Sequence, residues 1–160
     1  MIRGTMQLAV SLSIVISGVR PLNAQTAQTR LWDAAMTGDT VELAAALTAG
    51  GRLDSLDTRR TPNGRLALNW AAINNRGNAI RFLLAHGAAI EGTNITGFTA
   101  LHHAAEAGSL DAARVLLAAG ADPAHRNNEG QKPSERARLE GHSDVAELIE
   151  AAERGTRPKP

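Results

Sequence analysis

The apolar residues of this chain recur in short clusters separated by glycines and polar residues. One cluster reads Ala71-Ala72, and a second one, Ile80 with Leu83-Leu84, follows a few residues later. Side chains three and four residues apart share one face of a helix, so the second cluster predicts a short amphipathic helix. The paired alanines predict a preceding helix whose small side chains let a neighbouring helix approach closely. The pattern therefore predicts two short helices in succession.

The same arrangement returns every 33 residues along the chain. Gly64, Gly97 and Gly130 begin three segments that align at this offset, and Leu83-Leu84 falls on Leu116-Leu117. A copy further upstream aligns at an offset of 37, so the connection that follows it carries four extra residues. Units of this length cannot bury their apolar faces alone, and stacking them buries a continuous core. The period therefore predicts a solenoid.

Residues that favour helix ends stand at the expected places in each unit. We expect Thr99 to cap the first helix of its unit and Pro133 to occupy a first helical position. Gly38 and Gly108 are expected to end first helices in the left-handed conformation, with Asn75 as the substitute at the matching place. The polar connections between units are rich in Asn, Thr, Asp and Gly, as turns require.

These features resemble the ankyrin repeat. The resemblance rests on the 33-residue period, on Gly97-Phe98-Thr99-Ala100-Leu101-His102 with Ala104-Ala105, and on Leu116-Leu117 with Gly120-Ala121-Asp122. The third unit has Ala100 where the family usually has proline, and the second departs further, with Leu66, Ala67 and Asn69 at the positions of Thr99, Ala100 and His102. The resemblance implies an all-α solenoid of about four helix-turn-helix repeats with short β-turn fingers, at about 29–60, 61–93, 94–126 and 127–153.

The first residues have the pattern of a secretory signal peptide. Arg3 gives a positive start, an uncharged apolar run follows over residues 8–19, and Ala24 is a small residue at a plausible cleavage point. The run is shorter than the roughly 20 apolar residues of a membrane span. We expect residues 1–24 to be cleaved, leaving a repeat domain over 25–153 and a disordered tail over 154–160. An uncleaved segment tethering a scaffold to the membrane is the alternative.

Composition narrows the range of possible chemistry. The chain has no cysteine, which excludes disulfides, thiolate nucleophiles and cysteine-based metal sites. Aromatic residues make up only 2%, so the core must be aliphatic and small. Without residues 1–24 the chain carries one more acid than base, and it shows none of the basic stripe that nucleic-acid binding favours.

His102, His103 and Glu106 are the residues that most invite a metal-site interpretation. None of the usual zinc patterns is present, and no second group of ligands accompanies them. The resemblance implies instead that His102 is structural and bonds to Thr99 and the neighbouring turn. We expect His103 and Glu106 to form a solvated polar pair, and we expect no metal and no cofactor. A His-based metal-handling protein remains an alternative that a metal-dependent shift in melting temperature would reveal.

Catalytic motifs are missing from the sequence. There is no G-x-S-x-G elbow, no phosphate-binding loop and no carboxylate pair at a distinctive place. Since function must be argued from a site, we expect a protein that is not an enzyme and has no small-molecule substrate.

The resemblance implies a concave groove that binds a protein partner through turn tips and the exposed side of each first helix. By position this groove comprises Asn63, Arg65, Ile73, Asn74, Ile95, Thr96, Phe98, Glu106, Ala107, Arg126, Asn128 and Gln131. Ile95 and Phe98 are the expected anchors, because a few apolar or aromatic side chains dominate interface energy. The alternative for Phe98 is packing on the adjacent turn.

Three further expectations concern the rest of the surface and the setting. Trp70 is expected to pack between units and Trp32 over the first helix, while residues 53–60 should form a longer, solvated polar finger. The leader and the missing cysteines favour the bacterial periplasm or the secreted medium, and we expect a monomer. There it would act as an accessory, protective or immunity factor, and the residues do not identify its partner.

Overall fold

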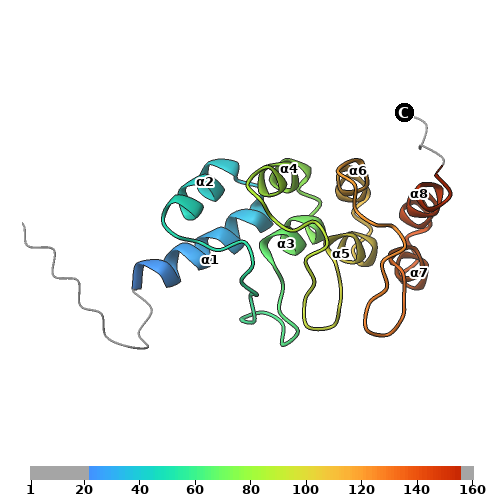
Figure 1. The fold of residues 1–160 in the computed structure, drawn as a ribbon, viewed down its shortest axis with the longest axis horizontal. Helices are drawn as coiled ribbons and strands as arrows, with labels where there is room; N and C mark the ends of the chain where they lie inside the picture. Colours follow the sequence, from blue (N-terminus) through green and yellow to red (C-terminus); the bar gives the residue numbers. More distant parts are fainter. Residues whose placement is uncertain (1–21, 156–160) are drawn as a thin grey trace, which may run out of the picture.

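The computed structural model describes residues 22–155, and these form an elongated array of helices (Figure 1). The helices are α1 Leu22–Thr37, α2 Thr40–Thr48, α3 Ala67–Ile73, α4 Gly77–Ala85, α5 Ala100–Glu106, α6 Leu110–Ala118, α7 Pro133–Leu139 and α8 Ser143–Glu153. Within residues 22–155 there is no strand. The expected all-α repeat solenoid is confirmed.

The helices form two layers with loops projecting from one side. The odd-numbered helices α1, α3, α5 and α7 contact one another in sequence and form the inner layer, and α2, α4, α6 and α8 form the outer layer beside them. The connections before α3, α5 and α7 project beyond the odd-numbered layer on the same side (Figure 1). We call these connections, residues 49–66, 86–99 and 119–132, the first, second and third fingers.

The core is built from small and branched aliphatic side chains, as the composition requires. In α4 the buried residues are Ala79, Ile80 and Leu83, and their equivalents in α6 are Ala112, Ala113 and Leu116. The paired alanines of α3 and α5 are fully buried between the layers. Because alanine brings helix axes close together, packing of this kind fixes the spacing of the repeats.

The helix ends follow the sequence signals. The Thr99 side chain caps α5, α7 begins at Pro133, and Asn75 adopts the left-handed φ of 55° expected from its place. Gly108 has a φ of 66°, and a Cβ there would lie 2.6 Å from Nδ1 of His142 in the next repeat. Glycine at this position therefore satisfies both the backbone conformation and the contact between repeats.

Most of the predicted signal peptide and of the predicted tail lies outside the described residues. The expected cleavage point after Ala24 lies inside α1, while the leader up to residue 21 is not described. At the other end Arg154 and Gly155 complete the termination of α8, and the rest of the expected tail is not described. Between residues 22 and 155 no helix is long and apolar enough to cross a membrane. Signal peptide, cleavage and tail stay predictions.

Candidate functional site

The second and third fingers are shaped from within by an asparagine at the same repeat position. Oδ1 of Asn94 accepts hydrogen bonds from the backbone N–H groups of Thr96 at 3.0 Å and Phe98 at 2.9 Å. Asn127 does the same for Gln131 at 2.9 Å in the third finger. Both asparagines are buried, so each tip is held by its own side-chain bonds.

Adjacent finger tips are also hydrogen-bonded to each other. The Ile95 N–H donates to the carbonyl of Asn63 at 3.1 Å, and the Asn128 N–H donates to that of Thr96 at 3.1 Å. The Asn128 side chain adds a bond to the Ile95 carbonyl at 3.0 Å. A Cβ on Gly97 would lie 2.5 Å from Asn128, so this close approach needs glycine. The three tips therefore form one continuous edge, along which these site residues are brought together.

Asp57 takes the asparagine position in the first finger, which places the four extra residues between Asp57 and Gly64. The Asp57 carboxylate is fully buried and accepts from Nε of Arg59 at 2.8 Å and from Nε1 of Trp70 at 3.2 Å. Burial alone would raise the pKa of Asp57, but the hydrogen bonds from Arg59 and Trp70 outweigh it and hold that pKa below its usual value. The carboxylate therefore organises the longer finger.

The arginines of the first finger lie over the two tryptophans. The guanidinium carbon of Arg59 is 4.8 Å from the ring centroid of Trp32, and that of Arg65 is 4.8 Å from Trp70. The guanidinium carbon of Arg60 lies 6.0 Å from the ring centroid of Trp70. Both tryptophans are buried, as expected. The tip of this finger is exposed at Thr58, Arg59 and Arg60, as expected for a polar tip. It is not a plain solvated loop, however, because a buried carboxylate and cation–π contacts hold it against the helices.

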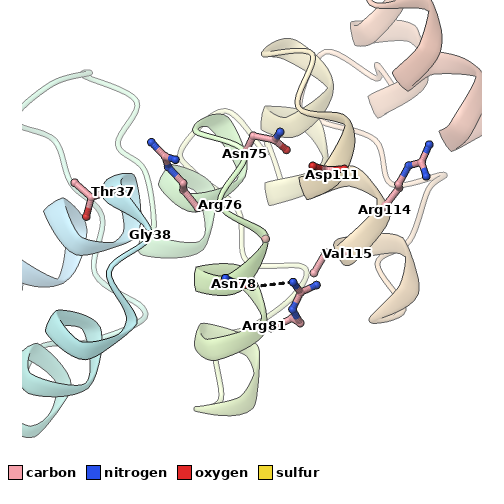
Figure 2. A pocket seen from close by; sticks show the side chains of 10 residues that line it. Thr37, Gly38, Asn75, Arg76, Asn78, Arg81, Asp111, Arg114 and Val115 are labelled. Carbon is pink, nitrogen blue, oxygen red and sulfur yellow. Dashed lines mark hydrogen bonds between the residues drawn. The ribbon is translucent and has the colours of Figure 1, made fainter.

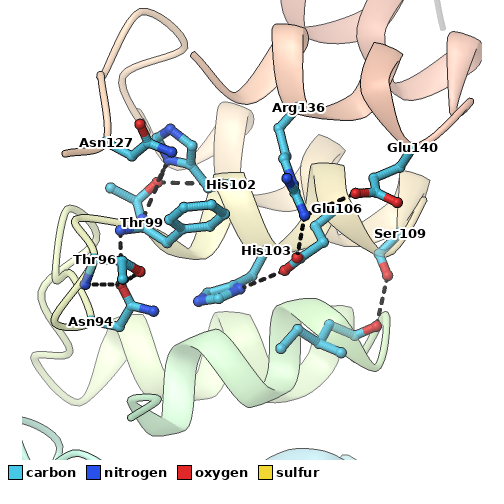
Figure 3. Close-up of polar contacts among 12 residues, drawn as sticks. Asn94, Thr96, Thr99, His102, His103, Glu106, Ser109, Asn127, Arg136 and Glu140 are labelled. Atoms are coloured by element: carbon cyan, nitrogen blue, oxygen red, sulfur yellow. Dashed lines mark hydrogen bonds and ion pairs between the residues drawn. The ribbon is translucent and has the colours of Figure 1, made fainter. Parts of the chain in front are cut away.

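His102 is a structural histidine, as the resemblance implied. Its Nδ1 accepts from the Thr99 hydroxyl at 2.9 Å, and its Nε2–H donates to the Gln131 carbonyl in the third finger at 3.0 Å. The ring is fully buried, and burial lowers the pKa of His102 to about 4. The neutral ring therefore ties α5 to its own cap at Thr99 (Figure 3) and, through the Gln131 carbonyl, to the next repeat.

The expected solvated pair of His103 and Glu106 is wrong for the histidine, which is 2% exposed. Nδ1 of His103 contacts Glu106 at 3.3 Å, its Nε2 finds no protein partner, and burial lowers the pKa of His103. Glu106 also accepts from Arg136 of the next repeat at 2.8 Å (Figure 3). Hydrogen bonds from His103 and then Arg136 lower the pKa of Glu106 to about 2. Glu106 thus bridges α5 and α7.

This arrangement gives no support to metal binding by the histidines. Both ring nitrogens of His102 are already hydrogen-bonded within the protein. In the part of the chain that the structure describes, no three His, Cys, Asp or Glu side chains gather in a way that could hold a metal ion.

The two expected anchors of the second finger differ in their surroundings. The Phe98 ring is half-buried, with its centroid 5.3 Å from that of His102 and 5.4 Å from that of His103, and the Arg136 guanidinium lies 5.7 Å away. Ile95 is 60% exposed at the fingertip. Phe98 therefore packs within its repeat junction, while Ile95 is available to a partner.

The remaining site residues lie near the two ends of the inner-layer helices, some at their C-terminal ends and some on the third finger. Ile73 and Asn74 end α3, Ala107 ends α5, and these are separated from the fingers by the length of a helix. Ile73 is half-buried and its carbonyl accepts from the Ser109 hydroxyl at 2.9 Å. On the third finger Arg126 is exposed, whereas Gln131 is half-buried.

Sequence reasoning missed one exposed residue of this surface, Leu139. It occupies in α7 the position that Glu106 occupies in α5, and it is 66% exposed. Applying the 33-residue offset to Glu106 would have found it. No comparable signal points to Arg60, because its place beside Trp70 depends on the fold of the first finger.

Comparison with known proteins agrees with the geometry. A family model described as ankyrin repeats (3 copies) matches residues 31–127 and 90–157. The chain is 33% identical over 143 residues to the tyrosine-protein kinase Shark of Drosophila melanogaster, covering 88% of this chain and 15% of that protein. It is 32% identical over 133 residues to the B-cell lymphoma 3 protein homolog of Mus musculus, covering 82% and 29%.

A shorter relative is the protein phosphatase 1 regulatory subunit 27 of Mus musculus, 38% identical over 81 residues, which cover 51% of this chain and 52% of that protein. The aligned part spans less than two thirds of each of these relatives, so their names describe more than the shared repeats. The family model, in contrast, covers far more than half of this chain. The chain belongs to the ankyrin-repeat family.

Proposed function

We propose that this protein is a non-catalytic interaction module that binds a protein partner through the finger tips and the exposed ends of the inner helices. The observation that carries the proposal is the exposure of Ile95, 60%, at the centre of an edge where all three fingers are hydrogen-bonded together. A large apolar side chain held on a rigid support suits an interface anchor, because little entropy is lost on binding.

The family and the relatives support the coarser part of this proposal. Ankyrin repeats are interaction modules, and one relative is named as a regulatory subunit of a phosphatase. The kinase relative shares only 15% of its length with this chain, so its catalytic name is not transferred. Several polar groups of the described site, including those of His102 and Glu106, are used in structural bonds between repeats, which supports binding over catalysis.

The chemistry of the surface suggests what the partner must offer. Ile95 presents an apolar side chain at the tip of the second finger, and Leu139 presents one at the end of α7. Arg60 and Arg65 lie around Trp70 at the first finger. Arginine and aromatic residues often dominate the energy of an interface. A partner with apolar side chains for Ile95 and Leu139, and with acceptors for the arginines, would complement this surface.

We further propose that binding takes place outside the bacterial cytoplasm, as part of an accessory, protective or immunity function. The support is the signal-peptide pattern of residues 1–24 alone. Mass measurement of the protein recovered from the periplasm tests this step, since removal of residues 1–24 should lower the mass accordingly. Recovery of the intact chain from the membrane fraction would contradict it and favour the tethered scaffold.

The interaction itself is tested by affinity capture from periplasmic extract with mass spectrometry, comparing matched variants. Ile95→Ala combined with Leu139→Ala removes the two exposed apolar side chains of the proposed surface. Val41→Ala is the control, because Val41 is 79% exposed but lies on α2 in the other layer. Phe98 is kept, since its replacement would disturb the packing around His102.

We expect the double variant to lose the captured partner while Val41→Ala retains it. Both variants should keep the helical circular dichroism of the parent, because the replaced side chains are exposed. Undiminished capture by the folded double variant would show that the surface is wrongly assigned. Equal loss in the control would point to binding through the outer layer instead.

A further inference from the structure

The outer layer carries a furrow between α4 and α6 that the proposed partner surface does not use. It consists of two adjoining hollows of about 610 and 520 Å³, and both are lined by Arg81, Arg114 and Val115. Figure 2 shows the wider hollow, with Arg81 extending from α4 toward Val115 on α6. The shared lining makes the two hollows one continuous surface feature.

The two ends of this furrow differ in chemistry. The end near the helix starts is polar and is lined by Asn75, Arg76, Asn78 and Asp111. This end extends past the start of α4 to Thr37 and Gly38, at the turn between α1 and α2. The other end is lined by Leu84, Ala118 and Ala119 and is mostly apolar. The furrow is thus amphipathic along its length, with the two shared arginines where the ends meet.

The arginines of the furrow have no carboxylate partners among the described residues. Arg76 donates to the Met36 carbonyl at 3.1 Å, and Arg81 donates to Oδ1 of Asn78 at 2.9 Å. Arg114 makes no hydrogen bond or ion pair with residues 22–155. Elsewhere most arginines are paired, as Arg138 is with Glu150 at 2.7 Å. With Asp111 as the single acid of the lining, the furrow carries an excess of positive charge.

The fold does not require arginine at these places. Arg81 and Arg114 occupy one repeat position, and its counterparts in the outermost repeats are Ala44 and Glu147. Both arginines are exposed. Arg81 also lies beside the first turn of α4, which contains no acidic residue. A cation near a helix start is unfavourable, and a carboxylate placed between these arginines would relieve it.

We propose that this furrow docks an acidic amphipathic helix of a protein partner, independently of the finger surface. Two parallel helices present a groove into which a third can pack, and Ala118 and Ala119 allow a close approach. Carboxylates on the two edges of its apolar stripe would meet Arg81 on one wall and Arg114 on the other, while the stripe itself covers Leu84. Nine-residue walls of about 13 Å match roughly two to three turns of such a helix.

The test uses a synthetic acetylated and amidated helical peptide, with a leucine stripe and glutamates along both edges of that stripe. The ¹⁵N-labelled full chain is titrated with this peptide and followed by NMR. We expect chemical-shift changes in the amides of α4 and α6 and in the Nε–H groups of Arg81 and Arg114. The pair Arg81→Glu and Arg114→Glu should weaken binding by roughly tenfold or more, because attraction becomes repulsion.

Matched controls separate the furrow from other basic surface. Arg126→Glu reverses an exposed arginine on the third finger and should leave peptide affinity unchanged. The milder pair Arg81→Gln and Arg114→Gln covers the case in which charge reversal unfolds the protein. The Ile95→Ala and Leu139→Ala variant should bind the peptide normally, so failure of this proposal and failure of the finger proposal are distinguishable.

Several results would overturn the proposal. One is the absence of shift changes on α4 and α6 at millimolar peptide. Another is an equal response to a peptide with lysine in place of glutamate, or to a scrambled peptide that cannot form the stripe. Equal changes with inorganic phosphate alone would show a simple anion site. Self-association of the chain through this furrow, seen by sedimentation without peptide, would assign the groove to a second copy.

Discussion

The second and third repeats have similar backbones but are held to the following repeat by different bonds. His102 in the third repeat donates from Nε2 to a carbonyl of the next finger at 3.0 Å. Asn69 stands at the same position in the second repeat, is fully buried, and finds no protein partner for either of its amide atoms. Its side chain is too short to span the distance that the imidazole spans. Residues at the same position of two repeats therefore need not make the same hydrogen bond.

The junction after the second repeat is held together by other bonds. Ser109 donates its hydroxyl to the Ile73 carbonyl at 2.9 Å, and the Ala112 N–H donates to Oδ1 of Asn75 at 2.8 Å. These bonds lie at the turns between paired helices, at the ends of α3 and α5 that are away from the fingers. The hydrogen bonds between repeats can lie at different positions from one junction to the next, because the packing of buried alanines already sets the spacing of the repeats.

The end repeats make the same point with two further residues. Trp32 occupies the position of His102 and donates from Nε1 to the Ser55 carbonyl of the next finger at 3.1 Å. Glu135 occupies it in the last repeat and accepts from the Lys132 N–H at 2.8 Å, which caps its own helix. Trp32 therefore bonds to the first finger, whereas Glu135 bonds only to the backbone at the start of its own helix.

The largest expected effect comes from the apolar core, in which the two repeats are alike. Leu116→Ala and Leu83→Ala each remove a fully buried side chain from the outer layer of one repeat. Each should lower the free energy of unfolding by about 2–5 kcal/mol through the cavity left behind. Urea denaturation measures both losses. A small loss at one position only would show that the two cores are not equivalent.

The second largest effect should be a loss of stability at low pH that arises in the third repeat and not in the second. The pKa of His102 is about 4 in the folded chain against 6.5 for the free side chain, so the unfolded state takes up the proton first. The stabilisation is complete above about pH 6.5 and is lost as the pH falls toward 4, by about 3 kcal/mol at most. Glu106, with a pKa of about 2, adds a second loss below its ordinary value of 4.5.

The corresponding measurement is denaturation at several pH values with His102→Asn, which installs the residue of the second repeat. The free energy of unfolding of this variant should depend less on pH between 6.5 and 4. A residual dependence should remain from His103, because burial also lowers the pKa of His103. Hydrogen exchange in the parent at pH 4.5 should show α5 opening before α3. An unchanged pH profile in the variant would contradict the assignment to His102.

Removing the polar side chain should affect the two repeats in different ways. His102→Ala leaves the Thr99 hydroxyl without its histidine partner and breaks the tie to the third finger, so it should cost about 1–3 kcal/mol. Asn69→Leu removes a buried amide that has no partner, so it should be neutral or stabilising. Thermal unfolding of the pair checks the difference in sign. A strong loss with Asn69→Leu would reveal a partner for this amide, such as buried water.

The smallest expected effect comes from introducing the histidine hydrogen bond of the third repeat into the second repeat. Leu66→Thr with Asn69→His gives the second repeat the cap and the histidine of the third. The new ring would donate to the Phe98 carbonyl, which is the counterpart of that of Gln131. The gain should be about 1 kcal/mol, the worth of a typical hydrogen bond. A melting temperature below that of the parent would show that the lost burial of Leu66 outweighs the new hydrogen bonds.

Much of the fold could be predicted from the sequence because its signals are local or periodic. The left-handed Asn75, the cap at Thr99 and the helix start at Pro133 each depend on a few neighbouring residues. The role of His102 followed from its place in the family motif. The candidate surface could be predicted only as a set of positions, since exposure depends on how neighbouring repeats pack. Phe98 and Ile95 looked alike in sequence and differ in burial.

The sequence by itself determined the period, the helix boundaries and the alternation of small and branched apolar residues, and these suffice for a stacked array of helices. The tertiary structure alone decided where the polar groups went. It buried His103 and Asp57, turned Glu106 toward Arg136, and folded the longer first finger over two tryptophans. Helix formation and turns depend on neighbours along the chain. The burial and charge of a side chain depend instead on residues about one repeat away, whose approach is set only when the units stack.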